Sequence, residues 1–162
     1  IASNELLMGS TTAVRDYVER TTPGTYNTTL TNNTCLMTWA FNMRQSRADP
    51  SGFDASNYGV AVVLAGPNAN FTLGDGYAVE LGNSGSTDPL RLVRYTGGLD
   101  LNTNITNLLS ASDFGANYLD VRVTYNPLTD TWALFYTDNG AGPFGNPLVA
   151  ATSAGTTIAA TA

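Results

Sequence analysis

Four side chains in two alternating stretches of this chain have the chemistry of a sugar-binding groove. Arg91 and Tyr95 share one face of LRLVRYT. Asp120 and Arg122 share one face of YLDVRVTY. If both stretches lie in one sheet, the four side chains converge on a shallow groove, where a ring stacks on sugar C–H bonds and charged groups bind vicinal hydroxyls. The alternative is cross-strand ion pairing on a wetted sheet, which contributes about 0.2–1 kcal/mol per pair.

Hydrolysis of a glycosidic bond requires two carboxylates that face each other across a cleft. The glutamates of the chain are Glu5, Glu19 and Glu80, and none belongs to a strand-borne pair such as E-x-D-x-E. Glu80 stands alone in YAVEL, where a solvated face is the favoured interpretation over a catalytic acid. The chain has no histidine, which excludes Ser-His-Asp and Cys-His nucleophiles. The sequence therefore predicts no enzyme and no catalytic residues.

The aspartates do not form a recognisable metal site. Most of them adjoin turn-forming residues, as in Asp49-Pro50, Asp75-Gly76, Asp88-Pro89 and Asp138-Asn139. No D-x-D-x-D-G run is present, so calcium stays an open alternative and no cofactor is predicted. One cysteine and no histidine exclude a structural zinc site.

Composition restricts the partners of the chain. Charged residues make up 12% of the 162 residues, the net charge is −6, and all seven cationic residues are arginines. Nucleic acid and anionic membranes need clustered cations, so neither is expected as a partner. No run approaches 18 apolar residues, which argues against membrane insertion. Hydrophobic residues at 43%, together with abundant Thr and Asn, are typical of a secreted β-protein rather than of a disordered chain.

Alternation of apolar and polar residues predicts a chain of short strands. The predicted strands are residues 34–44, 58–65, 77–81, 90–96, 118–125 and 132–138. The face of LRLVRYT opposite Arg91 carries Leu90, Leu92 and Arg94. The nearly continuous apolar run 58–65 predicts a central strand that is covered on both faces. The pattern as a whole predicts one domain, residues 1–162, folded as an antiparallel two-sheet β-sandwich or jelly roll.

The remaining segments are less regular. Residues 1–30 are interpreted as an initial strand followed by a turn at Pro23-Gly24, and residues 97–117 as a loop with a short helical turn near 106–112. The small-residue tail 150–162 is predicted to be an edge strand or a frayed end. Cys35 shares the alternation of Trp39, which predicts a buried and inert thiol.

The hairpin of residues 118–140 resembles the hairpin of concanavalin A-like and laminin G-like jelly rolls, which include lectins and glucanases. The longer stretch from Trp39 to Gly140, with NYGVAVVLAG, GDGYAVELGNSGSTDPLRLVRYTGGLD and YLDVRVTYNPLTDTWALFYTDNG, resembles a domain of secreted multidomain proteins of the Bacteroidetes. Many of those proteins are exported by the type IX secretion system. The resemblance implies a two-sheet jelly roll, an extracellular or cell-surface location, and partnership with carbohydrate-active or adhesive modules.

The sequence also departs from that family. The carboxylate cluster of the glucanases and the calcium ligands of the legume lectins are not recognisable, which implies a non-catalytic domain. Domains of this type continue past the hairpin into a further aromatic-rich strand, whereas this chain ends in ATSAGTTIAATA. Together with a start at Ile1 rather than Met, this predicts a fragment of a larger secreted protein, or a sandwich completed by residues 1–20, by the tail or by another chain.

Two functions from different classes follow as expectations. The first is a non-catalytic extracellular module that recognises a glycan or polysaccharide. The alternative is a structural or adhesin subunit of a surface protein, which assembles with other copies or domains through strand sharing.

Overall fold

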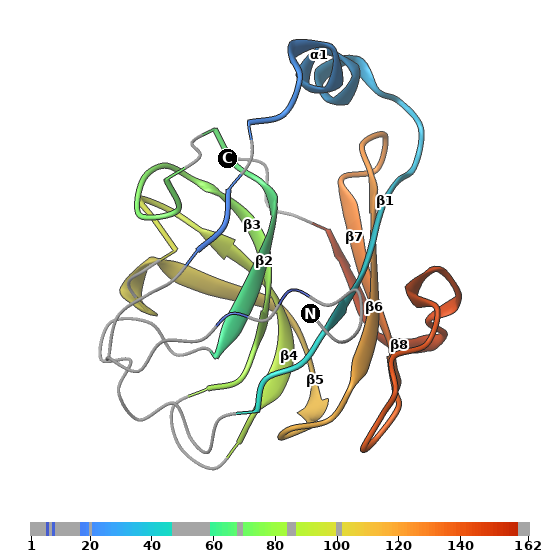
Figure 1. The fold of residues 1–162 in the computed structure, drawn as a ribbon. Coiled ribbons are helices and arrows are strands. Elements are labelled where there is room, and N and C mark those ends of the chain that lie inside the picture. Colours follow the sequence, from blue (N-terminus) through green and yellow to red (C-terminus); the bar gives the residue numbers. More distant parts are fainter. Residues whose placement is uncertain are drawn as a thin grey trace.

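The computed structural model describes residues 6, 8, 17–19, 21–46, 59–67, 70–83, 87–99 and 102–158. In chain order, its elements are α1 (Gly24–Asn32), β1 (Met37–Met43), β2 (Val60–Ala65), β3 (Gly76–Leu81), β4 (Pro89–Tyr95), η1 (Asn102–Asn104), β5 (Ile105–Asp113), β6 (Leu119–Asn126), β7 (Thr131–Asp138), η2 (Pro147–Val149) and β8 (Thr152–Ile158). The eight strands form two antiparallel sheets of four, in the orders β1-β6-β7-β8 (sheet A) and β2-β3-β4-β5 (sheet B). The predicted β-sandwich is therefore confirmed (Figure 1).

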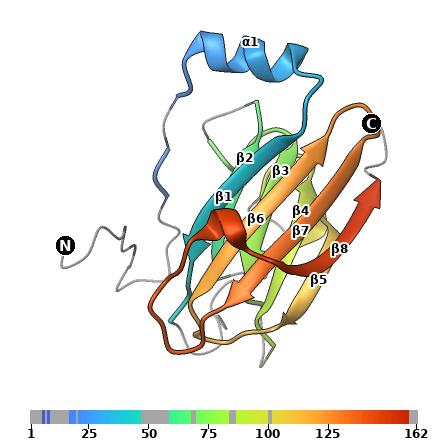
Figure 2. The ribbon, with the colours of Figure 1, turned by 90° about the vertical axis from the view of Figure 1, so that its right-hand side faces the viewer.

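The chain changes sheets between β1 and β2 and again between β5 and β6. On one side of the sandwich β5 and β8 approach each other, and a Cβ added to Gly155 of β8 would lie 2.9 Å from Leu109 of β5 (Figure 2). Strands β1 and β2 lie at the other side (Figure 1). The four consecutive strands of sheet B form a meander, and the jelly-roll connectivity implied by the resemblance is not confirmed.

The core lies between the two sheets because each strand places alternate apolar residues on its inner face. Its fully buried members include Val79, Leu92, Val121 and Leu134. The predicted hairpin is confirmed as β6 and β7, with Val121 opposite Tyr136 and Leu134 opposite Val123. The apolar face fixes this register, since a slip by one residue would move Val121 out of the core and Arg122 into it.

Sheet B is buried on its outer face as well as its inner one. A second apolar cluster covers the outer face, formed by Ala78, Val93, Tyr95 and Leu99 with Ala61, Phe71 and Ile105 packed against them. The ring of Tyr17 meets the ring of Phe71 at a centroid distance of 5.0 Å. The outer face of sheet B is therefore a second core rather than a wetted surface.

Strand β2 is an edge strand, so the prediction of a central strand at 58–65 is wrong. The central positions of sheet B belong to β3 and β4. The apolar run of β2 is explained by its two faces: Val62 packs against the inner core and Ala61 against the outer cluster, while Val63 is 43% exposed.

Two segments adopt a structure that the alternation did not indicate. Residues 105–113 form β5, not a loop or helical turn, because β4 supplies a pairing partner, and the register shifts twice along this pair. Residues 24–32 form α1 where a turn was predicted. The hydroxyls of Thr28 and Thr29 donate to the carbonyls of Gly24 and Thr25, at 3.1 and 2.8 Å. Most of the predicted initial strand at 1–20 lies outside the described residues.

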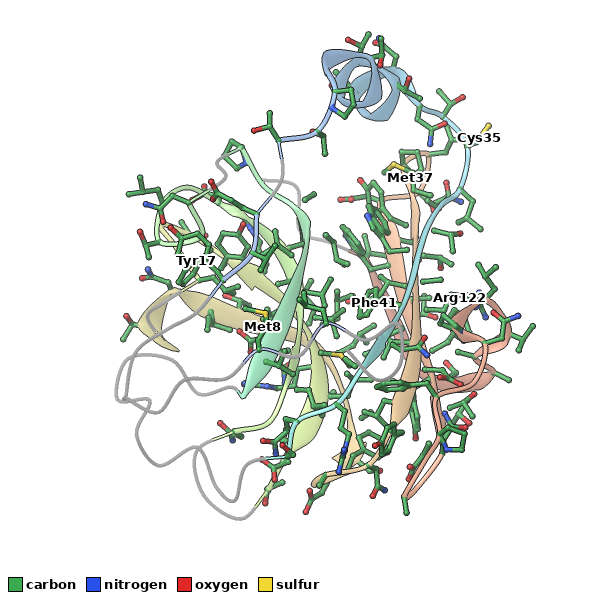
Figure 3. The ribbon with its side chains drawn as sticks, in the orientation of Figure 1. Met8, Tyr17, Cys35, Met37, Phe41 and Arg122 are labelled. Carbon is green, nitrogen blue, oxygen red and sulfur yellow. The ribbon has the colours of Figure 1, made fainter. Side chains whose placement is uncertain are left out.

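Cys35 is exposed, so the prediction of a buried thiol is wrong. It precedes β1, and its backbone is held by the side chain of Asn33, which accepts from the Cys35 N–H at 3.1 Å and donates to its carbonyl at 2.7 Å. Figure 3 shows Cys35 at the surface, outside the sandwich. The inward alternation begins only at Met37.

Residues 139–150 connect β7 to β8 and are called the strap from here on. The strap crosses the outer face of sheet A (Figure 2). The short helix η2 within the strap lies against β1 and β6. The strap then leads into β8, which pairs with β7 and lies at the edge of sheet A among the described strands. No helix in the described ranges is long and apolar enough to span a membrane.

Candidate functional site

The four predicted ligand-binding residues do not meet. Arg91 and Tyr95 lie on β4 in sheet B, whereas Asp120 and Arg122 lie on β6 in sheet A. Each pair occupies the outer face of its own sheet, so the whole sandwich separates the two pairs. The prediction of one shared groove is wrong, because it required β4 and β6 to belong to one sheet.

Arg91 pairs with Glu80, which lies directly opposite it on β3. The Nη2 atom of Arg91 is 2.8 Å from Oε2 of Glu80, whose side chain is fully buried. Burial raises the pKa of Glu80 to about 7 and outweighs the opposing attraction of the Arg91 guanidinium. The predicted solvated face for Glu80 is therefore wrong. Among the described residues, the charged group that influences the pKa of Glu80 is Arg91, not a second carboxylate. This arrangement does not support a catalytic carboxylate pair at Glu80.

Tyr95 is buried, at 1% exposure, in the outer cluster of sheet B. Its hydroxyl lies so close to Gly66 and Gly76 that a Cβ on either glycine would collide with it. Burial and the negative charge of Asp75 raise the pKa of Tyr95. A ring that is enclosed in this way does not offer a surface on which a ligand can stack.

Asp120 and Arg122 hold the strap on sheet A. Asp120 is 3% exposed, and its Oδ1 accepts from the Gly145 N–H at 2.8 Å. Arg122 donates from Nε and Nη2 to the carbonyl of Ala150, at 3.3 and 3.0 Å, and its guanidinium lies 4.0 Å from the centroid of the Phe135 ring. Figure 3 shows Phe41 of β1 pointing between the sheets and Arg122 pointing outward toward the strap.

A different set of side chains forms the candidate site. Four aromatic rings, here called the aromatic cluster, meet at the end of the sandwich next to the β6–β7 turn: Trp39, Tyr77, Tyr125 and Trp132. Trp132 lies at the centre, with ring centroids of Tyr77 and Tyr125 each 4.5 Å away and that of Trp39 5.7 Å away. Tyr77 comes from sheet B and the other three from sheet A, so the cluster bridges the two sheets.

Exposure within the aromatic cluster is uneven. Trp132 is 2% exposed, whereas Trp39, Tyr77 and Tyr125 are half-buried. The indole Nε1–H of Trp132 is buried and has no hydrogen-bond partner within the described ranges. Buried donors nearly always have an acceptor, because an unmade hydrogen bond costs about 1–3 kcal/mol. The cluster therefore combines three half-buried aromatic residues with an unused donor.

The β6–β7 turn adds a fixed carboxylate beside the cluster. The Tyr125 hydroxyl donates to Oδ1 of Asp130 at 2.8 Å. Burial, with the hydrogen bond and charge of Asp130 as further causes, raises the pKa of Tyr125 to about 12. Asp130 has φ of 50°, a left-handed conformation that is uncommon for a residue with a Cβ and that often marks functional loops.

The sequence contained a signal for the aromatic cluster that the alternation alone did not reveal. Trp39, Tyr125 and Trp132 each alternate with apolar residues of their own strand, a pattern that is typical of ordinary core. The additional signal is their position at strand ends around one turn, where an inner face reaches solvent. Tyr77 could not be assigned to the same end without knowing the partner sheet.

The described part of the chain contains no group of three or more His, Cys, Asp or Glu side chains that could hold a metal ion. Comparison of the chain with protein-family models, with curated proteins and with solved structures finds no match.

Proposed function

We propose that this protein is a non-catalytic carbohydrate-binding module and that its ligand binds at the aromatic cluster. The observation that carries the proposal is the unused indole N–H of Trp132 at the centre of three half-buried rings. With it we propose the extracellular or cell-surface location and the concanavalin A-like relationship that the sequence resemblance implies.

Sugars suit such a site for two physical reasons. Their apolar C–H faces pack on aromatic rings, and Trp39, Tyr77 and Tyr125 leave part of each ring accessible. Their hydroxyls both donate and accept, so neighbouring sugar oxygens match the chemistry of the Trp132 Nε1–H donor and of the Asp130 carboxylate acceptor.

Replacing Trp132 by Phe tests the role of the indole N–H. The ring stays in the cluster and the donor is lost, so we expect glycan affinity to fall about tenfold, the value of one hydrogen bond. Trp39→Ala, which removes a half-buried ring, should weaken binding at least as much. Screening on a glycan array identifies the ligand, and calorimetry measures its dissociation constant for each variant.

Phe144→Ala is the matched control. Phe144 packs on Tyr118 at a centroid distance of 4.7 Å, at the opposite end of sheet A. Its loss should leave affinity unchanged. If Phe144→Ala abolishes binding and Trp39→Ala does not, the ligand binds at the opposite end of sheet A and the proposed site at the aromatic cluster is wrong. If no glycan binds to the folded protein, the proposed function is wrong.

The assembly alternative is favoured by a separate observation. Within the described ranges β1 pairs with β6 alone and β2 with β3 alone, so two strand edges lie at the same side of the sandwich. An unpaired edge accepts a strand from another chain. Light scattering after size-exclusion chromatography, with and without calcium, separates the two functions. We expect residues 1–162 to be monomeric, as a glycan-binding module should be. Polymers would favour assembly by strand sharing over glycan binding as the function.

A further inference from the structure

Arg94 is a charged residue on the inner side of the sandwich, at the same end as the aromatic cluster. It lies on β4 directly opposite Tyr77 of β3, and the pairing of these strands is regular throughout. Alternation puts Arg94 on the same face as Leu90 and Leu92, both of which are fully buried in the core. Thr106 of β5 is its neighbour on the other side. Cross-strand neighbours have Cβ atoms about 4.5–5.5 Å apart, so the side chains of Arg94 and Tyr77 start next to each other on the same face of sheet B.

The other arginines in the described ranges all have protein acceptors. Arg91 pairs with Glu80, Arg122 donates to the Ala150 carbonyl, and Arg44 donates to the Ala116 carbonyl and to the Tyr118 hydroxyl. Arg94 is half-buried, yet it has no hydrogen bond or ion pair with any side chain or carbonyl in that part of the structure. No described residue accepts a hydrogen bond from the five guanidinium N–H donors of Arg94, which lies at the same end of the sandwich as the aromatic cluster.

We propose that the aromatic cluster selects an acidic saccharide, whose carboxylate or sulfate group binds to Arg94 while its ring packs on Tyr77. This inference rests on the proposed function. The planar guanidinium presents two parallel donors, which match the two oxygens of a carboxylate or sulfate. The carboxylate of Asp130 accepts a hydrogen bond from Tyr125 and belongs to the turn between β6 and β7 of sheet A, so it does not form an ion pair with Arg94.

The charge of the protein limits the size of the acidic ligand. A net charge of −6 repels long polyanions, and repulsion grows with the number of charges on the ligand. A single acidic sugar is attracted locally by Arg94 and is repelled only weakly by the net negative charge of the protein. The recognised unit is therefore one acidic residue within an otherwise neutral glycan, rather than a continuous polyanion.

Matched ligands test the selection directly. Calorimetry compares methyl glucuronide with methyl glucoside, and methyl galacturonide with methyl galactoside, which differ at C6 alone; glucose 6-sulfate separates sulfate from carboxylate. We expect an acidic member to bind at least about tenfold more tightly than its neutral partner, since a hydrogen bond between two charged groups is stronger than one between neutral groups. Arg94→Gln should abolish the preference, so that the acidic and neutral members of each pair bind with equal affinity.

Arg44→Gln is the control, because it removes the same charge at the opposite end of β1 and should preserve the preference. Equal binding of acidic and neutral members overturns the inference and leaves the proposed function standing. An acidic preference that survives in Arg94→Gln also overturns it, since the anion then binds elsewhere. Absence of binding to any of these sugars or to the glycan array overturns the inference and the proposed function together.

Discussion

Between pH 4.5 and pH 8, the Glu80→Gln variant should gain about 3 kcal/mol of stability relative to the natural protein. The fully buried carboxyl of Glu80 has a pKa raised from its usual 4.5 to about 7. Between the two pKa values the unfolded chain has released the proton while the folded protein holds it, so the folded state binds more protons and stability falls as pH rises. The contribution of Glu80 is fully present below pH 4.5 and is lost as pH rises through about 7. Each pH unit between the two pKa values corresponds to about 1.36 kcal/mol.

Urea unfolding of both proteins at several pH values measures this difference. Glutamine cannot titrate. Losing the ion pair with Arg91 therefore changes the free energy of unfolding of the variant by the same amount at every pH, and this amount does not affect the pH dependence. Asp138→Asn, which removes an exposed carboxylate, controls for the change in net charge. A stability difference between Glu80→Gln and the natural protein that stays constant with pH would contradict the buried-carboxyl interpretation.

Replacing Arg122 by Ala should lower the free energy of unfolding by about 3 kcal/mol. The substitution leaves the carbonyl of the buried Ala150 without its donors, which costs about 1–3 kcal/mol. It also removes the guanidinium from the Phe135 ring, a contact worth about 0.5–2 kcal/mol. Arg122→Lys keeps the charge but not the planar fork, and should lie between the natural protein and the alanine variant.

Arg44→Ala provides the comparison for Arg122→Ala. Arg44 makes the same kinds of contact, a hydrogen bond to a carbonyl and a guanidinium 4.3 Å from the Tyr118 ring, but it is exposed. Its loss should cost less than about 1 kcal/mol. Equal losses from the two variants in urea unfolding would show that Arg122 does not anchor the strap.

If these results are obtained, three of the predicted ligand-binding residues have structural roles instead. Asp120 and Arg122 fasten the strap, and Arg91 pairs with the buried carboxyl of Glu80. They were predicted to bind a ligand, but Asp120 and Arg122 have their partners in the strap, a segment that no alternation pattern places, and Arg91 has its partner on the neighbouring strand β3. The same reasoning applies to Tyr95, since the glycines that enclose it belong to β3 and to the link between β2 and β3.

The sequence by itself determined six of the eight strands, namely β1, β2, β3, β4, β6 and β7, together with the fold class. Alternation in the segments that form β3, β4, β6 and β7 specified inner and outer faces, because a side chain on a strand must point to one side or the other. The hairpin β6–β7 followed from the same rule together with its turn residues. It also placed Trp132 and Arg94 on inner faces, where both are found.

Only the tertiary structure decided which strands share a sheet and what covers each outer face. Alternation has a period of two and carries no information about the neighbour of a strand, so it could not assign β4 and β6 to different sheets. It also could not distinguish an outer face covered by a strap or a second cluster from one in water. The aromatic cluster depends on both decisions, since Tyr77 reaches Trp132 across the sandwich only once the two sheets are packed face to face.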